Sequence, residues 1–291
     1  MPVPFVRLLP LAALLVGCAG NAVPPASAVK LANGVALRAF PPELHLVVGA
    51  SRTLFVAAYD GTERVQDVPL AGHGSVAEGA IAHVEGNAIV AVAPGTAKLH
   101  VESELGAVDV PIVVHAAAPT ALAFEPVATP RIGEPVAVKT TLTWAEGTSD
   151  ATFDVAFSTE TPQHLHVPEA IDAHGWVAPL DDQPATLHAH LGELEATTVV
   201  RATGKPPVGI EIRLAWSYLN LRRFGAFARY EDGEVREISG ACLWETGDKR
   251  WRGAVGGTPL GPLLRADQVS WDRTVRCTVA GVRGDGTLFS P

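Results

Sequence analysis

The sequence lacks the motifs that identify common classes of enzyme. It contains no Gly-x-Ser-x-Gly elbow, no His-Glu-x-x-His pair, no phosphate-binding loop and no calcium-binding loop. Residues 72–77, GHGSVA, fit the loose dinucleotide pattern, but strand-like residues follow them and leave no room for the helix that the pattern requires. We therefore expect no catalytic site, no cofactor and no enzymatic activity.

The chain also lacks an excess of basic residues. Its formal net charge is −9, so attraction to phosphate backbones is not expected and nucleic acid is excluded as a partner. The charge is uneven, with 10 Lys and Arg against 21 Asp and Glu over 1–205, and 12 against 10 over 206–291. We expect the C-terminal third to present a different surface from the rest.

Methionine and long runs of helix-forming residues are scarce, whereas glycine and proline are plentiful. The chain has one Met, 28 Gly and 23 Pro, a composition that favours short strands and turns. Over 97–102 the apolar side chains fall on odd positions and the polar ones on even positions, and over 108–114 an apolar residue again recurs at every second position, now the even ones. This alternation is typical of half-buried antiparallel strands. The sequence predicts an all-β fold, and 291 residues are enough for two or three domains.

The amino end has the features of an export signal. An apolar run from Leu8 to Val16 follows Arg7, and it is too short for a membrane span of about 20 residues. The run ends in LVGC, with Cys18 last, and this ending resembles the lipobox of bacterial lipoproteins. The resemblance implies a signal peptide over 1–17, lipidation of Cys18 and a lipid anchor in the bacterial cell envelope.

The residues after the cysteine suit a surface tether. Several acyl chains on one residue make a durable anchor, whereas a single chain is marginal. Ala19 follows Cys18, which in the Gram-negative lipoprotein pattern implies transfer to the outer membrane. With Cys18, the small residues and prolines up to position 34 form a flexible tether that spans roughly 20–25 Å. The alternative is an ordinary signal peptide with an incidental cysteine.

Internal repeats suggest that one unit is built several times. The segment 83–103 reappears in shape at 170–190, as an apolar strand, a turn with proline and a second alternating strand. The segment 52–68, in which a strand turns over Asp-Gly, likewise recurs at 224–238. The period is about 85 residues, the size of a small β-sandwich.

These repeats resemble a known domain family. The strand and Asp-Gly turn, followed by VAEGAIAHVEGNAIVAVAPGTAKLHV and a closing hairpin, look like the bacterial Ig-like domain, group 2. ARYEDGEVREISGACLWE resembles the same pattern, whereas the middle copy lacks the Asp-Gly turn. The resemblance implies three tandem Ig-like β-sandwich domains. With joints at HAAAPT and ATGKPP, they are expected over 35–116, 117–204 and 205–291.

Two cysteines remain once Cys18 is assigned to lipid. Cys242 and Cys277 lie in the third predicted domain and would be exported to an oxidising compartment, so we expect them to form a disulfide. Alternation with Trp244 and with Val275 places both on the core side of their strands. In the Ig-like family, these strands would be neighbours within one sheet. The alternative is a pair of free buried thiols.

Histidines of the second domain are the strongest candidates for metal ligands. His164 and His166 form one pair and His188 and His190 another, and a spacing of two puts each pair on one face of a strand. Alternation turns the second pair outward. By analogy with the family, the two pairs lie on opposite sheets, so we expect no metal site. The alternative is an envelope enzyme or metal-binding protein in which the four histidines converge.

The third domain contains four of the six tryptophans. Trp244 is expected in the core. Arg250, Trp251 and Arg252, together with Trp271, border an irregular glycine-rich and proline-rich segment over 253–268. Aromatic and arginine side chains at an exposed site suit a protein or glycan partner, and the alternative is that they cover the core. The tripeptide 283–285, Arg-Gly-Asp, is expected at the tip of the last hairpin.

The predicted function follows from this architecture. We expect a non-enzymatic lipoprotein whose Ig-like domains act in binding, adhesion or as a spacer, with the membrane held through the lipid anchor. The third domain, less acidic and richer in aromatic residues, is expected to meet the partner. A fold of this kind does not by itself identify the ligand.

Overall fold

The structure is a computed structural model, and it confirms the all-β prediction. Apart from the short 3₁₀ turn η2 (Ser239–Ala241), every regular element in the described part of the chain is a β-strand. No helix among these residues has the length and hydropathy needed to cross a membrane. The described residues are 35–61, 63–168, 174–218, 221–246, 249–252, 263–265 and 274–287.

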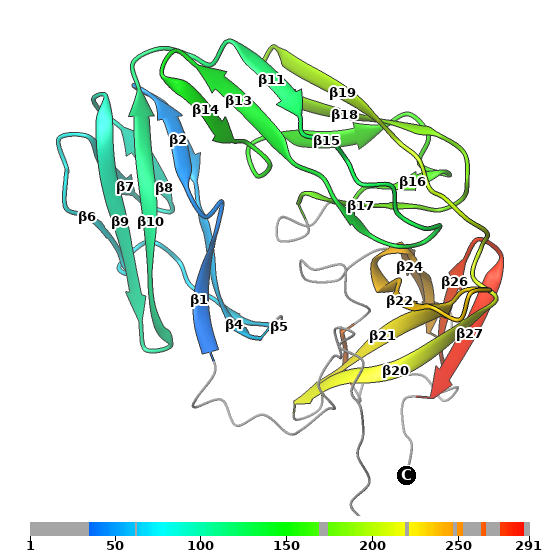
Figure 1. The fold of residues 1–291 in the computed structure, drawn as a ribbon. Coiled ribbons are helices and arrows are strands. Elements are labelled where there is room, and N and C mark those ends of the chain that lie inside the picture. The colour runs from blue at the N-terminus through cyan, green and yellow to red at the C-terminus, as the bar shows by residue number, and fades with distance from the viewer. Residues whose placement is uncertain are drawn as a thin grey trace, which may run out of the picture.

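The strands fall into three successive sets, which follow one another along an arc in Figure 1. We call them the first unit (35–115), the second unit (121–200) and the third unit (209–287). Each unit pairs its strands only within itself, and its apolar faces meet in a core between sheets, as expected for Ig-like sandwiches. The segments 116–120 and 201–208 connect the units.

The first unit has a core between two main sheets. One sheet has the order β2-β10-β9-β6, the second has the order β1-β4-β5, and β3-β8-β7 form a third, smaller sheet. The strands are β1 (Val35–Phe40), β2 (Leu44–Val47), β3 (Ser51–Thr53), β4 (Phe55–Asp60), β5 (Glu63–Asp67), β6 (Gly74–Val76), β7 (Ala82–Glu85), β8 (Ala88–Ala91), β9 (Gly95–Ser103) and β10 (Gly106–His115).

The alternation predicted for this unit is confirmed. In β9 the side chains of Ala97, Leu99 and Val101 are buried, whereas the residues between them are exposed. The Asp-Gly turn after β4 is also present, with Gly61 at a φ of 60°. Glycine populates this left-handed region at no steric cost, which explains why the chain reverses there.

The second unit has the sheet orders β11-β13-β14, β15-β18-β19 and β12-β17-β16. Its apolar residues form two neighbouring clusters, both of which contact Phe124 and Phe157. The strands are β11 (Ala121–Phe124), β12 (Val136–Ala137), β13 (Thr140–Trp144), β14 (Gly147–Asp150), β15 (Ala156–Thr159), β16 (Leu165–His166), β17 (Trp176–Pro179), β18 (Ala185–Leu191) and β19 (Leu194–Val200).

The third unit has the sheet orders β20-β21-β22, with β25 also paired to β21, and β24-β23-β26-β27. Trp244 is fully buried in its core, as predicted. The strands are β20 (Gly209–Tyr218), β21 (Leu221–Arg229), β22 (Val235–Glu237), β23 (Leu243–Thr246), β24 (Lys249–Arg252), β25 (Leu263–Arg265), β26 (Thr274–Val279) and β27 (Val282–Thr287). The described residues of the segment predicted to be irregular, 263–265, form the strand β25.

The Arg-Gly-Asp tripeptide is not at a hairpin tip, and this prediction was wrong. The turn between β26 and β27 is formed by Ala280 and Gly281, both at positive φ, as a two-residue hairpin turn requires. Gly284 lies inside β27, where a Cβ atom would come 2.5 Å from the carbonyl oxygen of Ile210. This glycine therefore serves the close packing of β27 against β20, and Asp285 forms ion pairs with arginines of its own sheet.

Candidate functional site

The predicted disulfide is present in the third unit. Cys242 and Cys277 are joined with a Cα–Cα distance of 5.2 Å, and both are fully buried. Cys277 lies in β26 directly opposite Trp244 of β23. The bond therefore joins β26 to the residue directly before β23, its neighbour in the same sheet, which agrees with the family resemblance. Cys18, the predicted lipidation site, lies outside the described residues.

The residues predicted to contact a partner are only partly described. Arg250, Trp251 and Arg252 belong to β24, the edge strand beside β23. The backbone register sets Trp251 opposite Trp244. Trp271 lies outside the described residues. The structure thus places three of the four on one strand at the edge of a sheet.

The histidine pairs of the second unit lie in different sheets. His166 belongs to β16 in the sheet β12-β17-β16, whereas His188 and His190 belong to β18 in the sheet β15-β18-β19. His164 precedes β16, and its Nδ1 lies 2.6 Å from Asp181 Oδ2. Leu187 and Ala189 alternate with the histidines of β18 and are buried, whereas His188 and His190 are not, as the alternation predicts.

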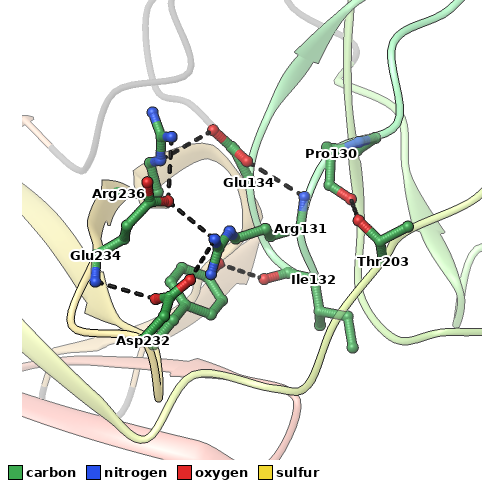
Figure 2. A network of polar contacts seen from close by, with 9 residues as sticks. Pro130, Arg131, Ile132, Glu134, Thr203, Asp232, Glu234 and Arg236 are labelled. Atoms are coloured by element: carbon green, nitrogen blue, oxygen red, sulfur yellow. Dashed lines mark hydrogen bonds and ion pairs between the residues drawn. The ribbon is translucent and has the colours of Figure 1, made fainter.

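The joint between the second and third units is braced by ion pairs, which Figure 2 shows from close by. Arg131, next to Pro130 in the second unit, points into the third unit. Its Nη2 lies 2.5 Å from Asp232 Oδ2 and 2.9 Å from Glu234 Oε2. The hydrogen bond with Asp232 raises the pKa of Arg131 and lowers that of Asp232. Both groups therefore stay charged over the physiological range.

A buried tyrosine adds a directional contact to the same joint. The hydroxyl of Tyr230 donates a hydrogen bond of 2.7 Å to the carbonyl oxygen of Ile132, and the guanidinium of Arg131 lies over the tyrosine ring. Tyr230 is 3% exposed. Burial raises its pKa to about 12, so the hydroxyl keeps its proton and remains a donor. Loss of this donor would leave a carbonyl group unpaired at the joint.

Apolar contacts make this joint part of a core. Ala178 and Leu180, which come from the second unit, belong to the same buried cluster as Trp244 and the disulfide. Gly133 packs so closely against the third unit that a Cβ atom would lie 2.8 Å from Val279 Cγ1. Because these side chains share one core, the two units are held in a fixed relation by more than their connecting segment.

A groove follows the same joint. Its volume is about 550 Å³, and its lining residues come from both units. The lining includes the apolar Ile132 and Leu180 together with the charged Asp181, Asp182 and Lys205. Mixed walls of this kind are suited to holding a small polar ligand.

The joint between the first and second units is built around stacked rings. His115, the last residue of β10, stacks on Trp144 of β13 with ring centroids 3.7 Å apart and planes 6° apart. A hydrogen bond of 3.0 Å connects His115 Nε2 with Nδ1 of His45 in β2. His115 Nδ1 also lies 3.3 Å from Glu146 of the second unit. Two histidines of the first unit therefore meet the tryptophan and carboxylate of the second.

A second contact supports this joint. Arg52 of β3 donates a hydrogen bond to the carbonyl oxygen of Phe153 and forms an ion pair with Asp154. Burial lowers the pKa of Arg52. The ring of Phe153 packs against Phe40 at the end of β1. The joint is therefore held at separate points, which restricts rotation of the second unit about the short connecting segment.

We expect acid to weaken the joint between the first and second units. Burial, followed by the neighbouring His115, lowers the pKa of His45 from its ordinary value of 6.5, against the opposing pull of Glu43 and Asp150. The unfolded chain thus binds this proton more readily than the folded chain. The contribution is fully present above pH 6.5 and declines as the pH falls towards the folded pKa.

Nuclear magnetic resonance of the two imidazoles, with hydrogen exchange of β2 and β13, measures this effect. The protection factors of the amides at the joint, which divide out the slower intrinsic exchange in acid, should fall between pH 7 and pH 5, and His45→Phe should reduce the change. The exposed His100, which contacts Asp109 within the first unit, provides the control variant His100→Phe. Protection factors at the joint that stay the same between pH 7 and pH 5 would contradict the prediction.

Sequence reasoning did not find the residues that brace the joints. Arg131 and Asp232 are 101 positions apart, and Arg131 belongs to no recognisable motif. The available signal was the Asp-Gly turn of the third unit, since a turn carrying both Tyr230 and Asp232 places polar groups at one end of a sandwich. Nothing in the sequence shows that this end meets the second unit.

The comparisons with known proteins add little to this picture. No protein-family model matches the chain. No curated protein matches it either. Among solved structures, domains 5–6 of the S-layer protein SbsC are 15% identical, with 58% of this chain and 97% of that chain covered and a TM-score of 0.31. The I9–I11 tandem from titin is 8% identical, with 84% of this chain and 94% of that chain covered and a TM-score of 0.22. Likenesses this weak carry no argument about function.

Proposed function

We propose that this chain is a non-enzymatic lipoprotein of the bacterial cell envelope, anchored at the outer membrane, that holds its third unit towards a protein or glycan partner. The observation that carries the proposal is the pair of braced joints. Each joint combines ring stacking or a shared core with ion pairs. Tandem sandwiches with such joints act as one arm, and a role in binding, adhesion or spacing follows from this geometry.

The braced joints matter because they reduce the conformational entropy that is lost when a partner binds. A flexible string of units samples many orientations, and a partner must restrict them when it binds. Arg131, Tyr230 and the shared core fix the direction of the third unit before a partner arrives. The tether that follows Cys18 would then be the main flexible element between membrane and arm.

The disulfide supports the proposed compartment. Cys242 and Cys277 form a buried bond, and such bonds persist in exported proteins, whereas the cytosol keeps thiols reduced. This agrees with the export signal and lipobox resemblance at the amino end. The partner-binding end is assigned to Arg250, Trp251, Arg252 and Trp271, because tryptophan and arginine are enriched in the residues that dominate binding energy.

The anchor is tested by metabolic labelling with a radioactive fatty acid in the producing bacterium. The wild-type chain should carry the label and sediment with membranes, whereas Cys18→Ser should be unlabelled and soluble. Cys277→Ser is the matched control, because it removes a cysteine that takes no lipid in this proposal. An unlabelled wild-type chain would exclude the lipid anchor.

The arm is tested by small-angle X-ray scattering of the Cys18→Ser chain. We expect a narrow distribution of interatomic distances, and a broader one after Arg131→Ala combined with Tyr230→Phe. The control is Arg213→Ala, which removes an exposed ion pair with Glu211 inside the third unit. A parent chain as variable as the double variant would show that the joints do not set the shape.

A further inference from the structure

The outward face of the sheet β15-β18-β19 gathers three groups that suit a metal ion. His188 and His190 project from the central strand β18, and Glu195 projects from β19 across the hairpin. One ring nitrogen from each histidine and one carboxylate oxygen of Glu195 all lie within 4.8 Å of one another. This is the single such grouping of three ligand-type residues in the described part of the chain.

The register of the hairpin explains why the three groups meet. His190 lies directly opposite Glu195, and His188 lies opposite Thr197. Because side chains alternate along a strand, His188 and His190 share one face with Glu195. Gly192, at a φ of 59°, allows the tight turn between the strands. The positions are set by the backbone of paired strands, so little has to be ordered when an ion binds.

The distances fit a tetrahedral ion. Glu195 Oε1 lies 3.2 Å from Nδ1 of His188 and 3.9 Å from Nε2 of His190. Ligand atoms at about 2.0–2.2 Å from a zinc ion in tetrahedral geometry are separated by about 3.3–3.6 Å. Small side-chain rotations therefore bring the three atoms to coordination distance. The two imidazole rings are nearly parallel, with an interplanar angle of 7° and ring centroids 6.0 Å apart.

The exposure of the three side chains leaves the site open to solvent. The side chain of His188 is 19% exposed. The other two ligands remain accessible, with His190 44% and Glu195 53% exposed. An ion can therefore enter from solvent, and a water molecule can occupy its fourth position.

The geometry points to a binding site for a divalent late transition-metal ion, of the zinc class, formed by His188, His190 and Glu195. Two imidazoles and one carboxylate with an open fourth position are the donor set that zinc takes in exposed protein sites. Neither His164 nor His166 takes part. The site is distinct from the joints, so it adds a metal-binding activity to the arm rather than a way of holding it.

The test is a calorimetric titration of zinc chloride into the full chain, produced without a histidine tag and stripped with a chelator. We expect saturable binding at one site, and a tetrahedral visible spectrum when cobalt replaces zinc. His188→Ala, His190→Ala and Glu195→Gln should each weaken binding by at least about tenfold, since even outer-shell changes cost that much. His100→Ala should bind as wild type, because His100 is an exposed strand histidine beside Asp109 and does not belong to the group of three ligand-type residues.

Circular dichroism without metal checks the fold of each variant. The three side chains face outward, so folding should be retained. The inference is overturned if the wild-type chain binds no zinc, if binding is weak and spread over many sites, or if the double variant His188→Ala, His190→Ala binds as tightly as His100→Ala. A failure of this kind leaves the lipid anchor and the braced arm untouched, because those are tested by labelling and scattering.

Discussion

Replacing Cys242 and Cys277 by alanine is expected to lower the free energy of unfolding of the third unit by about 3–4 kcal/mol. The disulfide closes a loop with a sequence separation of 35 residues, and its loss restores the freedom of that loop in the unfolded chain. Both side chains are fully buried beside Trp244, so the substitution also leaves a small void. A unit of about 80 residues has little stability to spare.

Denaturant unfolding, followed by hydrogen exchange of β23 and β26, measures this loss. The wild-type chain treated with a reducing agent should approach the double variant, whereas the reductant should leave the variant unchanged. Exchange in the first unit serves as the internal control, because no contact joins it to the disulfide in the described structure. Equal stability of the oxidised wild type and the double variant would contradict the prediction.

Trp144→Ala is expected to have an effect of similar size on the second unit, about 3–5 kcal/mol. Trp144 is 6% exposed, packs with Leu122 and Leu142, and donates a hydrogen bond of 2.8 Å to Ser149 Oγ. Its removal leaves a cavity and an unpaired hydroxyl. The substitution also removes the ring on which His115 stacks, so we expect the joint between the first and second units to loosen.

Trp176→Ala is the matched control for this experiment, because Trp176 belongs to the same unit but is 37% exposed. Trp144→Phe should recover part of the loss by refilling the site and restoring a stacking partner. Urea unfolding gives the free energies, and scattering of the same variants gives the flexibility. If Trp176→Ala destabilises the chain as much as Trp144→Ala, the ring does not have the role assigned to it.

The local features of the fold were accessible from the sequence. The alternation over 97–102 predicted which side chains of β9 are buried, because a strand has a period of two whatever surrounds it. The Asp-Gly turn after β4 was found because few residues adopt positive φ. Cys242 and Cys277 were paired correctly, since their phase placed both on the core side of the strands.

Glycine is a poor indicator of turns where its role is not local. The run VRGDGT has the composition of a turn, yet Gly284 and Gly286 lie within a strand and allow the approach of β20. The actual turn uses Ala280, a residue that rarely adopts positive φ and gives no turn signal. Composition alone does not distinguish a glycine needed for conformation from one needed for space.

The candidate metal site could be found from the sequence only in part. His188 and His190 were recognised as a pair on one face of a strand, and four histidines were considered together. The third ligand was missed because it is a glutamate across the hairpin. Its register with His190 depends on the two-residue turn at Gly192, so a closer reading of that turn would have identified Glu195.

By itself the sequence determined the class of fold, the phase of the strands, the turns and the partner of each core cysteine, because these depend on neighbours along the chain. Only the tertiary structure decided which ends of the sandwiches touch. Arg131 meets Asp232, and His115 meets Trp144, through the packing of separate sheets. Such contacts depend on the shape and charge of two whole surfaces, to which many residues contribute. No single position or local pattern in the sequence therefore identifies them.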